Sequence, residues 1–127
     1  MTTDDELRAA GKEVQGKLWP ATLNAPPGQF PAAKLAPEFF DYVQQTAFGM
    51  IWTRPNLATR DRSLITCSML AALGHHEELR AHLAGALSVG VTRDELIEAM
   101  MQVAVYAGVP AAVGALRVAA DVLGTDE

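Results

Sequence analysis

The sequence predicts an all-α fold: a compact antiparallel bundle of about six helices in a single domain. Apolar residues recur at helical spacing along most of the chain, and no segment shows the alternation typical of a strand. Glycines and prolines interrupt the apolar stretches at intervals of about one helix, and short connections between the last four helices favour antiparallel neighbours. We expect residues 1–36 to form an N-terminal helix and a proline-rich arm, and residues 37–124 to form the helical core.

The composition argues against a membrane protein, a disulfide-bonded protein and a nucleic-acid-binding protein. Half of the 127 residues are hydrophobic, yet charged residues interrupt every segment before it reaches the roughly 20 apolar residues of a membrane helix. The acidic N-terminus lacks the pattern of a signal peptide, and the single cysteine, Cys67, excludes an intrachain disulfide. We therefore expect a soluble cytoplasmic protein. A net charge of −5 with scattered basic residues argues against nucleic acid and favours a small molecule or another protein as partner.

The N-terminal third is predicted to contain one helix and one loop. Residues from about Asp4 to Lys17 carry apolar side chains at helical spacing. Residues 19–37 include five prolines, a composition that we expect to hold neither a helix nor a central strand. This segment either wraps a neighbouring subunit, covers a pocket, or is a plain surface loop.

The helical core is predicted to begin at Pro37, with a helix that Gly49 ends. In the connection that follows, Trp52 and Arg54 could meet a carboxylate ligand, or Trp52 could fill the core. Thr59 is predicted to cap, and Gly74 to end, a third helix that is apolar on every side, as a central, fully surrounded helix requires.

Later boundaries carry stronger local signals. The segment Thr92-Arg93-Asp94-Glu95 matches a capping box and predicts the start of a fifth helix. Gly108 and Pro110 separate that helix from a sixth, which runs through Leu123. The many alanines and glycines leave few large side chains for a monomeric core, which favours a symmetric homo-oligomer.

The most specific local feature lies in the fourth predicted helix, HHEELRAHLAGALSVG. His82 falls in the apolar stripe of this helix, and His75 and Glu78 precede it on the same side. A histidine with a glutamate one turn earlier is suited to general acid–base catalysis near neutral pH. The alternative is a core histidine bonded to a backbone carbonyl, with His75 and Glu78 in solvent.

A metal site is a further alternative, because histidine and glutamate are ligands for zinc and iron. Arg80 stands where an HExxH motif that begins at His76 would need its second histidine, and no second helix supplies a Glu-x-x-His pair. We expect neither a metal nor an organic cofactor.

Four segments resemble, in order and spacing, the gamma-carboxymuconolactone decarboxylase family: IWTRPNL, RDRSLITCSMLAAL, EELRAHL and GVTRDELIEAMMQVAVYAGVPAA. The likeness covers about residues 48–123. It implies the all-helical fold shared with alkylhydroperoxidase D and assembly into ring-like trimers or hexamers with sites near subunit interfaces. It also implies a cofactor-independent carboxy-lyase of aromatic catabolism, acting on a carboxylated butenolide such as gamma-carboxymuconolactone.

The resemblance assigns catalytic roles to His82 and Glu78, because the family segment Glu-Leu-Arg-x-His reads Glu78-Leu79-Arg80-Ala81-His82 here. The peroxidase branch carries a Cys-x-x-Cys pair in this helix, and this chain lacks it, which argues against disulfide chemistry. The decarboxylase resemblance implies that His82 protonates the dienolate carbon left by loss of carbon dioxide and that Glu78 fixes its tautomer. Arg54 or Arg62 would hold substrate carboxylates.

Three departures from the family pattern predict an altered pocket. Met50 stands where aspartate is usual, His75 where arginine is common, and Val113 where asparagine is common. These changes make the pocket more apolar and weaken carboxylate binding, which favours a different lactone or keto acid, an isomerase, or a non-catalytic binding homologue. Trp52 and Tyr106 are further candidates for lining the pocket, although an aromatic such as Tyr106 near a helix end could also serve packing.

Overall fold

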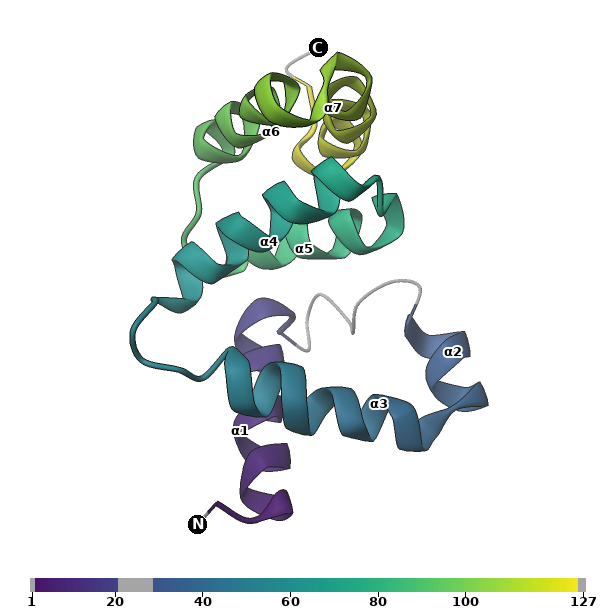
Figure 1. The fold of residues 1–127 in the computed structure, drawn as a ribbon, viewed down its shortest axis with the longest axis vertical. Coiled ribbons are helices and arrows are strands. Elements are labelled where there is room, and N and C mark those ends of the chain that lie inside the picture. Colours follow the sequence, from purple (N-terminus) through teal and green to yellow (C-terminus); the bar gives the residue numbers. More distant parts are fainter. Residues whose placement is uncertain (1, 21–28, 126–127) are drawn as a thin grey trace.

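The computed structural model describes residues 2–20 and 29–125, which form helices and turns with no strand among them and confirm the predicted all-α class. The helices stack in three tiers (Figure 1), with α6 and α7 at one end, α4 and α5 in the middle, and α1, α2, α3 and η2 at the other. Their bounds are α1 Asp4–Leu18, α2 Gln29–Leu35, α3 Pro37–Val43, η2 Gln44–Ile51, α4 Thr59–Leu73, α5 His76–Ser88, α6 Arg93–Ala107 and α7 Val109–Leu123. No helix in these ranges is both long and apolar enough to cross a membrane.

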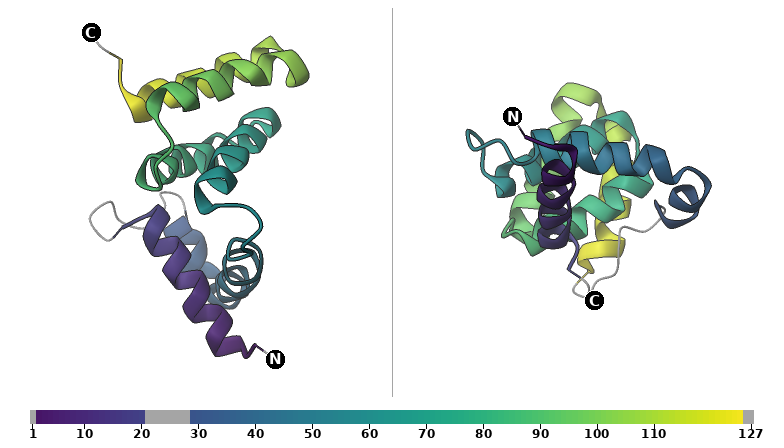
Figure 2. Two further views of the ribbon diagram at one scale, coloured as in Figure 1. Left: turned by 90° about the vertical axis from the view of Figure 1, so that its left-hand side faces the viewer. Right: turned by 90° about the horizontal axis from the view of Figure 1, so that it is seen from below.

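Helix α1 lies across η2, as the view from below in Figure 2 shows, and the crossing depends on two glycines. A Cβ on Gly11 would overlap the carbonyl oxygen of Gln44, and a Cβ on Gly49 would overlap the carbonyl oxygen of Leu7. Only glycine permits two backbones to approach this closely. The prediction that Gly49 ends its helix is therefore wrong: this glycine is a packing position, and the helix continues to Ile51.

The second half of that helix, η2, is a π-helix. Its wider turn is visible where the Trp52 backbone N–H donates to the carbonyl oxygen of Ala47, five residues earlier, at 3.0 Å. A π-helical turn shifts the following side chains out of the α-helical register, and such turns are frequent at functional sites. Here Phe48 within η2 is buried against the end of α1.

One part of the proline-rich segment is helical, contrary to the prediction. Residues 29–35 form α2, with Pro31 in its first turn. The prediction failed because a backbone N–H in the first turn has no partner within the helix, so proline is tolerated there. The roles predicted for the arm concern in part residues 21–28, which lie outside the described residues.

The four helices α4 to α7 enclose the main core. The predicted stops at Gly74 and Gly108 are confirmed, and both residues have positive φ angles, 75° and 101°. The predicted capping box is present, because the Thr92 hydroxyl accepts from the Glu95 N–H at 3.1 Å and the Glu95 carboxylate accepts from the Thr92 N–H at 2.9 Å. The buried residues of this core are Cys67, Ala71, Leu79, Leu83, Ala86, Val91, Leu96, Met100, Val103, Ala112, Ala115, Val118 and Ala119.

Two predictions for α4 are wrong. Its N-cap is Ala58, and Thr59 is already the first helical residue. In a single chain the helix is also not fully surrounded, because Ile65, Met69 and Leu73 are 44%, 53% and 68% exposed. The apolar character on every side of α4 therefore reflects one buried face and one exposed apolar face.

Candidate functional site

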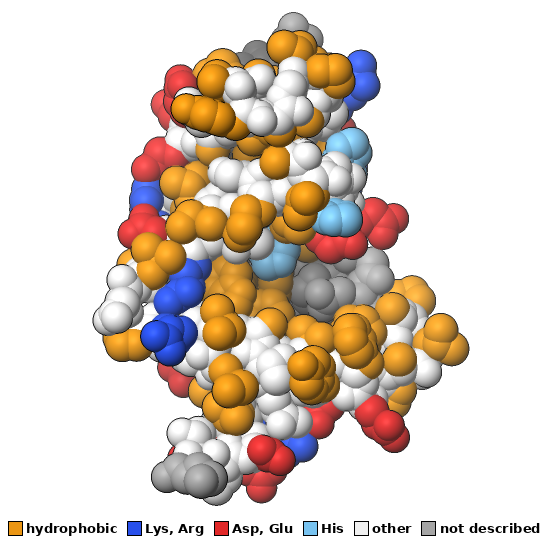
Figure 3. Space-filling view, viewed as in Figure 1, with side chains coloured by type: hydrophobic (Ala, Val, Ile, Leu, Met, Phe, Trp, Pro, Cys, Tyr) orange, Lys and Arg blue, Asp and Glu red, His pale blue; other side chains and the backbone are white. Residues whose placement is uncertain are grey.

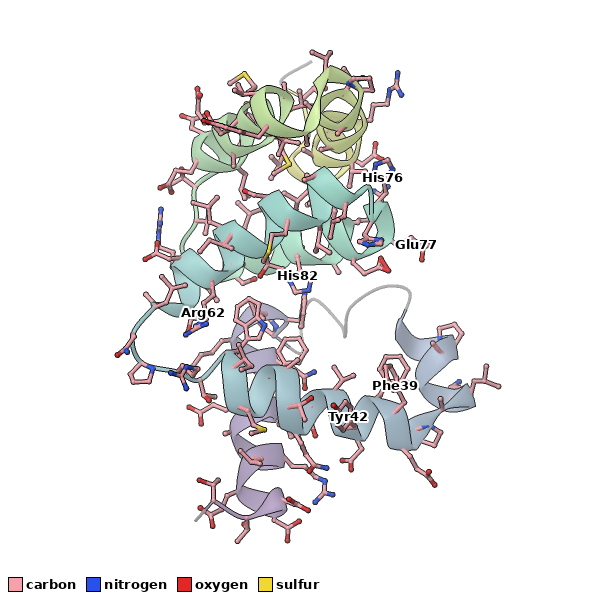
Figure 4. All side chains as sticks on the ribbon, in the orientation of Figure 1. Phe39, Tyr42, Arg62, His76, Glu77 and His82 are labelled. Carbon is pink, nitrogen blue, oxygen red and sulfur yellow. The ribbon has the colours of Figure 1, made fainter. Side chains whose placement is uncertain are left out.

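A hollow lies between the middle tier and η2, with apolar side chains at its back and a histidine on its rim (Figure 3). Figure 4 labels two residues beside it, His82 and Arg62. His82 points from α5 toward η2, and Arg62 points from α4 toward the connection that joins η2 to α4. The hollow is thus formed where the N-terminal tier meets the helix that carries His82.

Two aromatic side chains, Trp19 and Trp52, contact the His82 imidazole, and Phe48 contacts both of them. We call these three rings the aromatic cluster. The Trp19 ring meets the imidazole edge-on, with centroids 5.0 Å apart at 73°. The Trp52 ring lies nearly parallel to it at 6.2 Å and 20°. Phe48 joins the two tryptophans, at 6.0 Å from Trp19 and 5.8 Å from Trp52. His82 is therefore held in an apolar setting built from three separate elements.

This setting controls the protonation of His82. Burial lowers the pKa of His82 from 6.5 to about 4, and the nearby Glu78 carboxylate opposes this shift only in part. The imidazole is therefore neutral at neutral pH. Its Nδ1 is buried and has no hydrogen-bond partner among the described residues, so a core histidine bonded through Nδ1 to a carbonyl is not what the structure shows.

The other two polar residues predicted for this helix lie in solvent. His75 is the exposed N-cap of α5, and Glu78 is exposed one turn before His82. Glu78 acts on His82 through its charge, and no hydrogen bond joins the two side chains within the described part of the chain. Its predicted role in fixing the tautomer stays a prediction.

The two predicted arginines are placed differently. Arg62 is half-buried, and its guanidinium donates from Nε to the Leu57 carbonyl at 3.2 Å and from Nη2 to the Arg54 carbonyl at 3.0 Å. A guanidinium has five N–H donors, so the remaining ones can still bind a carboxylate. The exposed Arg54 side chain instead lines a cavity of about 310 Å³, together with Lys17 and Trp52.

Two further predicted site residues are exposed. Met50 lies in η2 with 51% of its surface accessible. Tyr106 lies in α6, is 87% exposed, and lines an apolar groove of about 310 Å³ between α4 and α6. Within one chain, Tyr106 therefore does not join the aromatic cluster.

Sequence reasoning missed Trp19 and Phe48 as site residues. Trp19 extends the buried stripe of Val14 and Leu18 in α1, which was its only sequence signal, and nothing in that stripe indicates contact with His82. Phe48 was assigned to a helix but not to the site, because its orientation depends on the π-helical turn.

Neither the remaining thiol nor the acidic side chains add a second reactive centre. Burial raises the pKa of the Cys67 thiol to about 12, so the thiol is inert. Across residues 2–20 and 29–125, no three His, Cys, Asp or Glu side chains gather in a group that could hold a metal ion.

The sequence matches the Carboxymuconolactone decarboxylase family over residues 37–121. The chain belongs to this family. Its matched region contains α3 to α6 and most of α7, and therefore includes Phe48, Trp52, Arg62 and His82. The α1 helix and Trp19 precede the matched region.

Two relatives in this family carry names that describe an activity. The chain is 41% identical over 85 residues to the 4-carboxymuconolactone decarboxylase of Acinetobacter baylyi, a match that covers 67% of this chain and 63% of that protein. The chain thus spans less than two thirds of that relative. It is 36% identical over 116 residues to the nitrosuccinic acid decarboxylase npaB of Metarhizium robertsii, which covers 90% of this chain and 76% of that protein.

Proposed function

We propose that this family member is a carboxy-lyase that removes carbon dioxide from a small dicarboxylic acid, with His82 as the general acid that protonates the product carbon. The placement of His82 carries this proposal: its imidazole is neutral, its Nδ1 has no partner within residues 2–20 and 29–125, and it lies at the rim of an apolar hollow and inside the family region. A histidine in such a site can exchange a proton with a ligand rather than with bulk water.

The two named substrates of the relatives indicate one substrate class. Nitrosuccinic acid and 4-carboxymuconolactone, which is the gamma-carboxymuconolactone considered above, share a succinate skeleton. In each acid, one carbon carries a carboxylate, a CH2–COO⁻ arm and an electron-accepting system, which is a nitro group in one acid and the conjugated lactone carbonyl in the other. We infer that the substrate is a succinate with an electron acceptor on the carbon that loses its carboxylate.

The proposed step needs only this acceptor and one proton. The bond between that carbon and its carboxylate breaks, carbon dioxide leaves, and the electron pair moves into the nitro or lactone system. His82 then delivers a proton to carbon and regains one from solvent. A bound dianion raises the pKa of a nearby histidine, so substrate binding favours the protonated imidazole that this step requires.

The two carboxylates of the substrate would lie in different surroundings, one apolar and one beside a guanidinium. The leaving carboxylate would lie against the aromatic cluster, where poor solvation favours conversion of the charged group into neutral carbon dioxide. The arm carboxylate would bind the remaining N–H groups of Arg62, whose guanidinium is held in place by its bonds to the carbonyls of Leu57 and Arg54.

The test is carbon dioxide release from the purified full chain, measured separately with nitrosuccinic acid and with 4-carboxymuconolactone. We expect turnover of at least one acid and a loss of roughly 100-fold or more in His82→Gln. His76→Gln is the matched control, because His76 is exposed on the same helix and faces Gly114 of α7. The proposal fails if neither acid is decarboxylated, and the role of His82 fails if both variants retain activity.

A second candidate function is isomerisation by proton transfer. It is favoured by the neutral imidazole, which can act as a base in the ligand-free protein. Incorporation of solvent deuterium into a lactone or keto acid without release of carbon dioxide would support isomerisation over decarboxylation.

A further inference from the structure

We propose that Trp19, which lies outside the family region, is a positioning residue for His82: it fixes where the imidazole lies and shields it from water. This inference rests on the proposed function for its catalytic consequence, and on the geometry of the N-terminal tier for everything else. It assigns α1 a direct part in building the site.

Trp19 holds His82 through two contacts. Its indole Nε1 donates to the carbonyl oxygen of Ala81, the residue directly before His82, in a buried hydrogen bond of 2.8 Å. Its ring packs against the imidazole in a T-shaped arrangement with centroids 5.0 Å apart. Because one side chain bonds the backbone and contacts the ring, a movement of Trp19 would release the imidazole and admit water together.

Helix α5 is shaped to receive this side chain. A Cβ on Gly85 would lie 3.2 Å from the Trp19 Nε1 atom and 3.4 Å from Leu18, and the neighbouring Ala81 is buried. Two small residues one turn apart, Ala81 and Gly85, thus leave room on α5 for the end of α1 to pack. At the other side, the Gly11 crossing with η2 sets the position of α1 and hence of Trp19.

Few charged groups contribute to the pKa of His82 beside the burial that Trp19 helps to provide. Among the described residues, Glu78 on α5 is the charged group that acts on the pKa of His82, and the Arg62 guanidinium of α4 is bonded to the carbonyls of Leu57 and Arg54. The sequence of η2 contains no titratable residue. On α1 the nearest charged residues, Glu13 and Lys17, pair with each other at 3.7 Å and line the cavity beside Trp52. Burial, to which Trp19 contributes directly, is therefore the main cause of the lowered pKa of His82.

The similarity to nitrosuccinic acid decarboxylase extends into α1. The family match begins at residue 37, whereas the match to nitrosuccinic acid decarboxylase covers 90% of this chain and so must include residue 19. The segment that carries Trp19 therefore extends the similarity with that relative beyond the family region.

The test compares Trp19→Ala and Trp19→Phe in the full chain, with Gly16→Ala as a control on the same helix, where a Cβ meets nothing within 4 Å. The first readout is the pKa of His82, followed by NMR of its ring nitrogens, with circular dichroism to verify folding. We expect Trp19→Ala to raise this pKa by about one unit or more as water enters, and Gly16→Ala to leave it unchanged.

Trp19→Phe keeps a ring against the imidazole but removes the N–H donor to Ala81. We expect a smaller rise in the His82 pKa and a loss in kcat of several-fold with little change in KM, since orientation and not substrate binding is affected. If Trp19→Ala does not fold, Trp19→Phe and Gly85→Ala, which presses on Nε1, provide the same test.

An unchanged His82 pKa in folded Trp19 variants would overturn the inference. The NMR readout needs no substrate, so it distinguishes failure of this inference from failure of the proposed function. A wild-type protein that decarboxylates neither acid, but whose His82 pKa rises in Trp19→Ala, would refute only the proposed function.

Discussion

Replacing Gly11 with alanine should destabilise the protein, although alanine is the better helix former. Alanine in a helix gains about 1 kcal/mol over glycine. At Gly11, however, the new Cβ would overlap the backbone carbonyl oxygen of Gln44 and lie 3.1 Å from the Gly49 nitrogen. Backbone atoms cannot rotate away as a side chain can, so α1 and η2 must separate, at a cost of about 1–3 kcal/mol.

Gly16→Ala isolates this cost, because Gly16 lies on the same helix and its Cβ would meet nothing within 4 Å. Both variants gain the same helix propensity, so the difference between their unfolding free energies measures the overlap alone. We expect Gly16→Ala to be more stable than Gly11→Ala by about 1–3 kcal/mol in urea unfolding. Equal stabilisation of both variants would refute the close crossing of α1 and η2.

The remaining predictions concern stability and reactivity. Burial lowers the pKa of His82 in the folded protein below its ordinary 6.5, so the contribution of His82 to stability is present above pH 6.5 and is lost as pH falls toward about 4. The free energy of unfolding, measured in urea, should therefore fall less between pH 7 and pH 4.5 in His82→Gln than in the wild type. Cys67, with a pKa of about 12, should resist iodoacetamide at pH 8 until urea unfolds the chain, and rapid labelling of the folded protein would contradict its burial. Leu83→Ala should cost about 2–5 kcal/mol, whereas Leu35→Ala, at an 88% exposed position, should cost almost nothing in the same assay.

Features with local causes were predictable from the sequence. The capping box at Thr92 and the glycine stops at Gly74 and Gly108 satisfy backbone groups within a few residues, and the structure confirms them. Gly49 gave the same signal as a stop but serves a contact with α1, which lies far away in the sequence. No local pattern distinguishes these two uses of glycine.

The candidate site was predictable only in part for the same reason. His82 could be placed on its helix by periodicity, but the Trp19 ring that contacts it, and the Phe48 ring that supports Trp19, come together through the crossing of α1 with a π-helix. The exposed residues of α4 show a related limit. An apolar pattern indicates that a face avoids water, and it does not indicate whether the same chain covers that face.

The tiered arrangement places His82 between two buried clusters, because Ala81 belongs to one of them and Leu83 to the other. Leu18, Trp19 and Phe48 form a small buried cluster with Val14 and Ala81, separate from the larger core of α4 to α7. Opening of that small cluster would expose the imidazole while the four-helix core stays folded. On warming, catalytic competence should therefore disappear before most of the helical signal, and amide exchange should be faster in α1 than in α5.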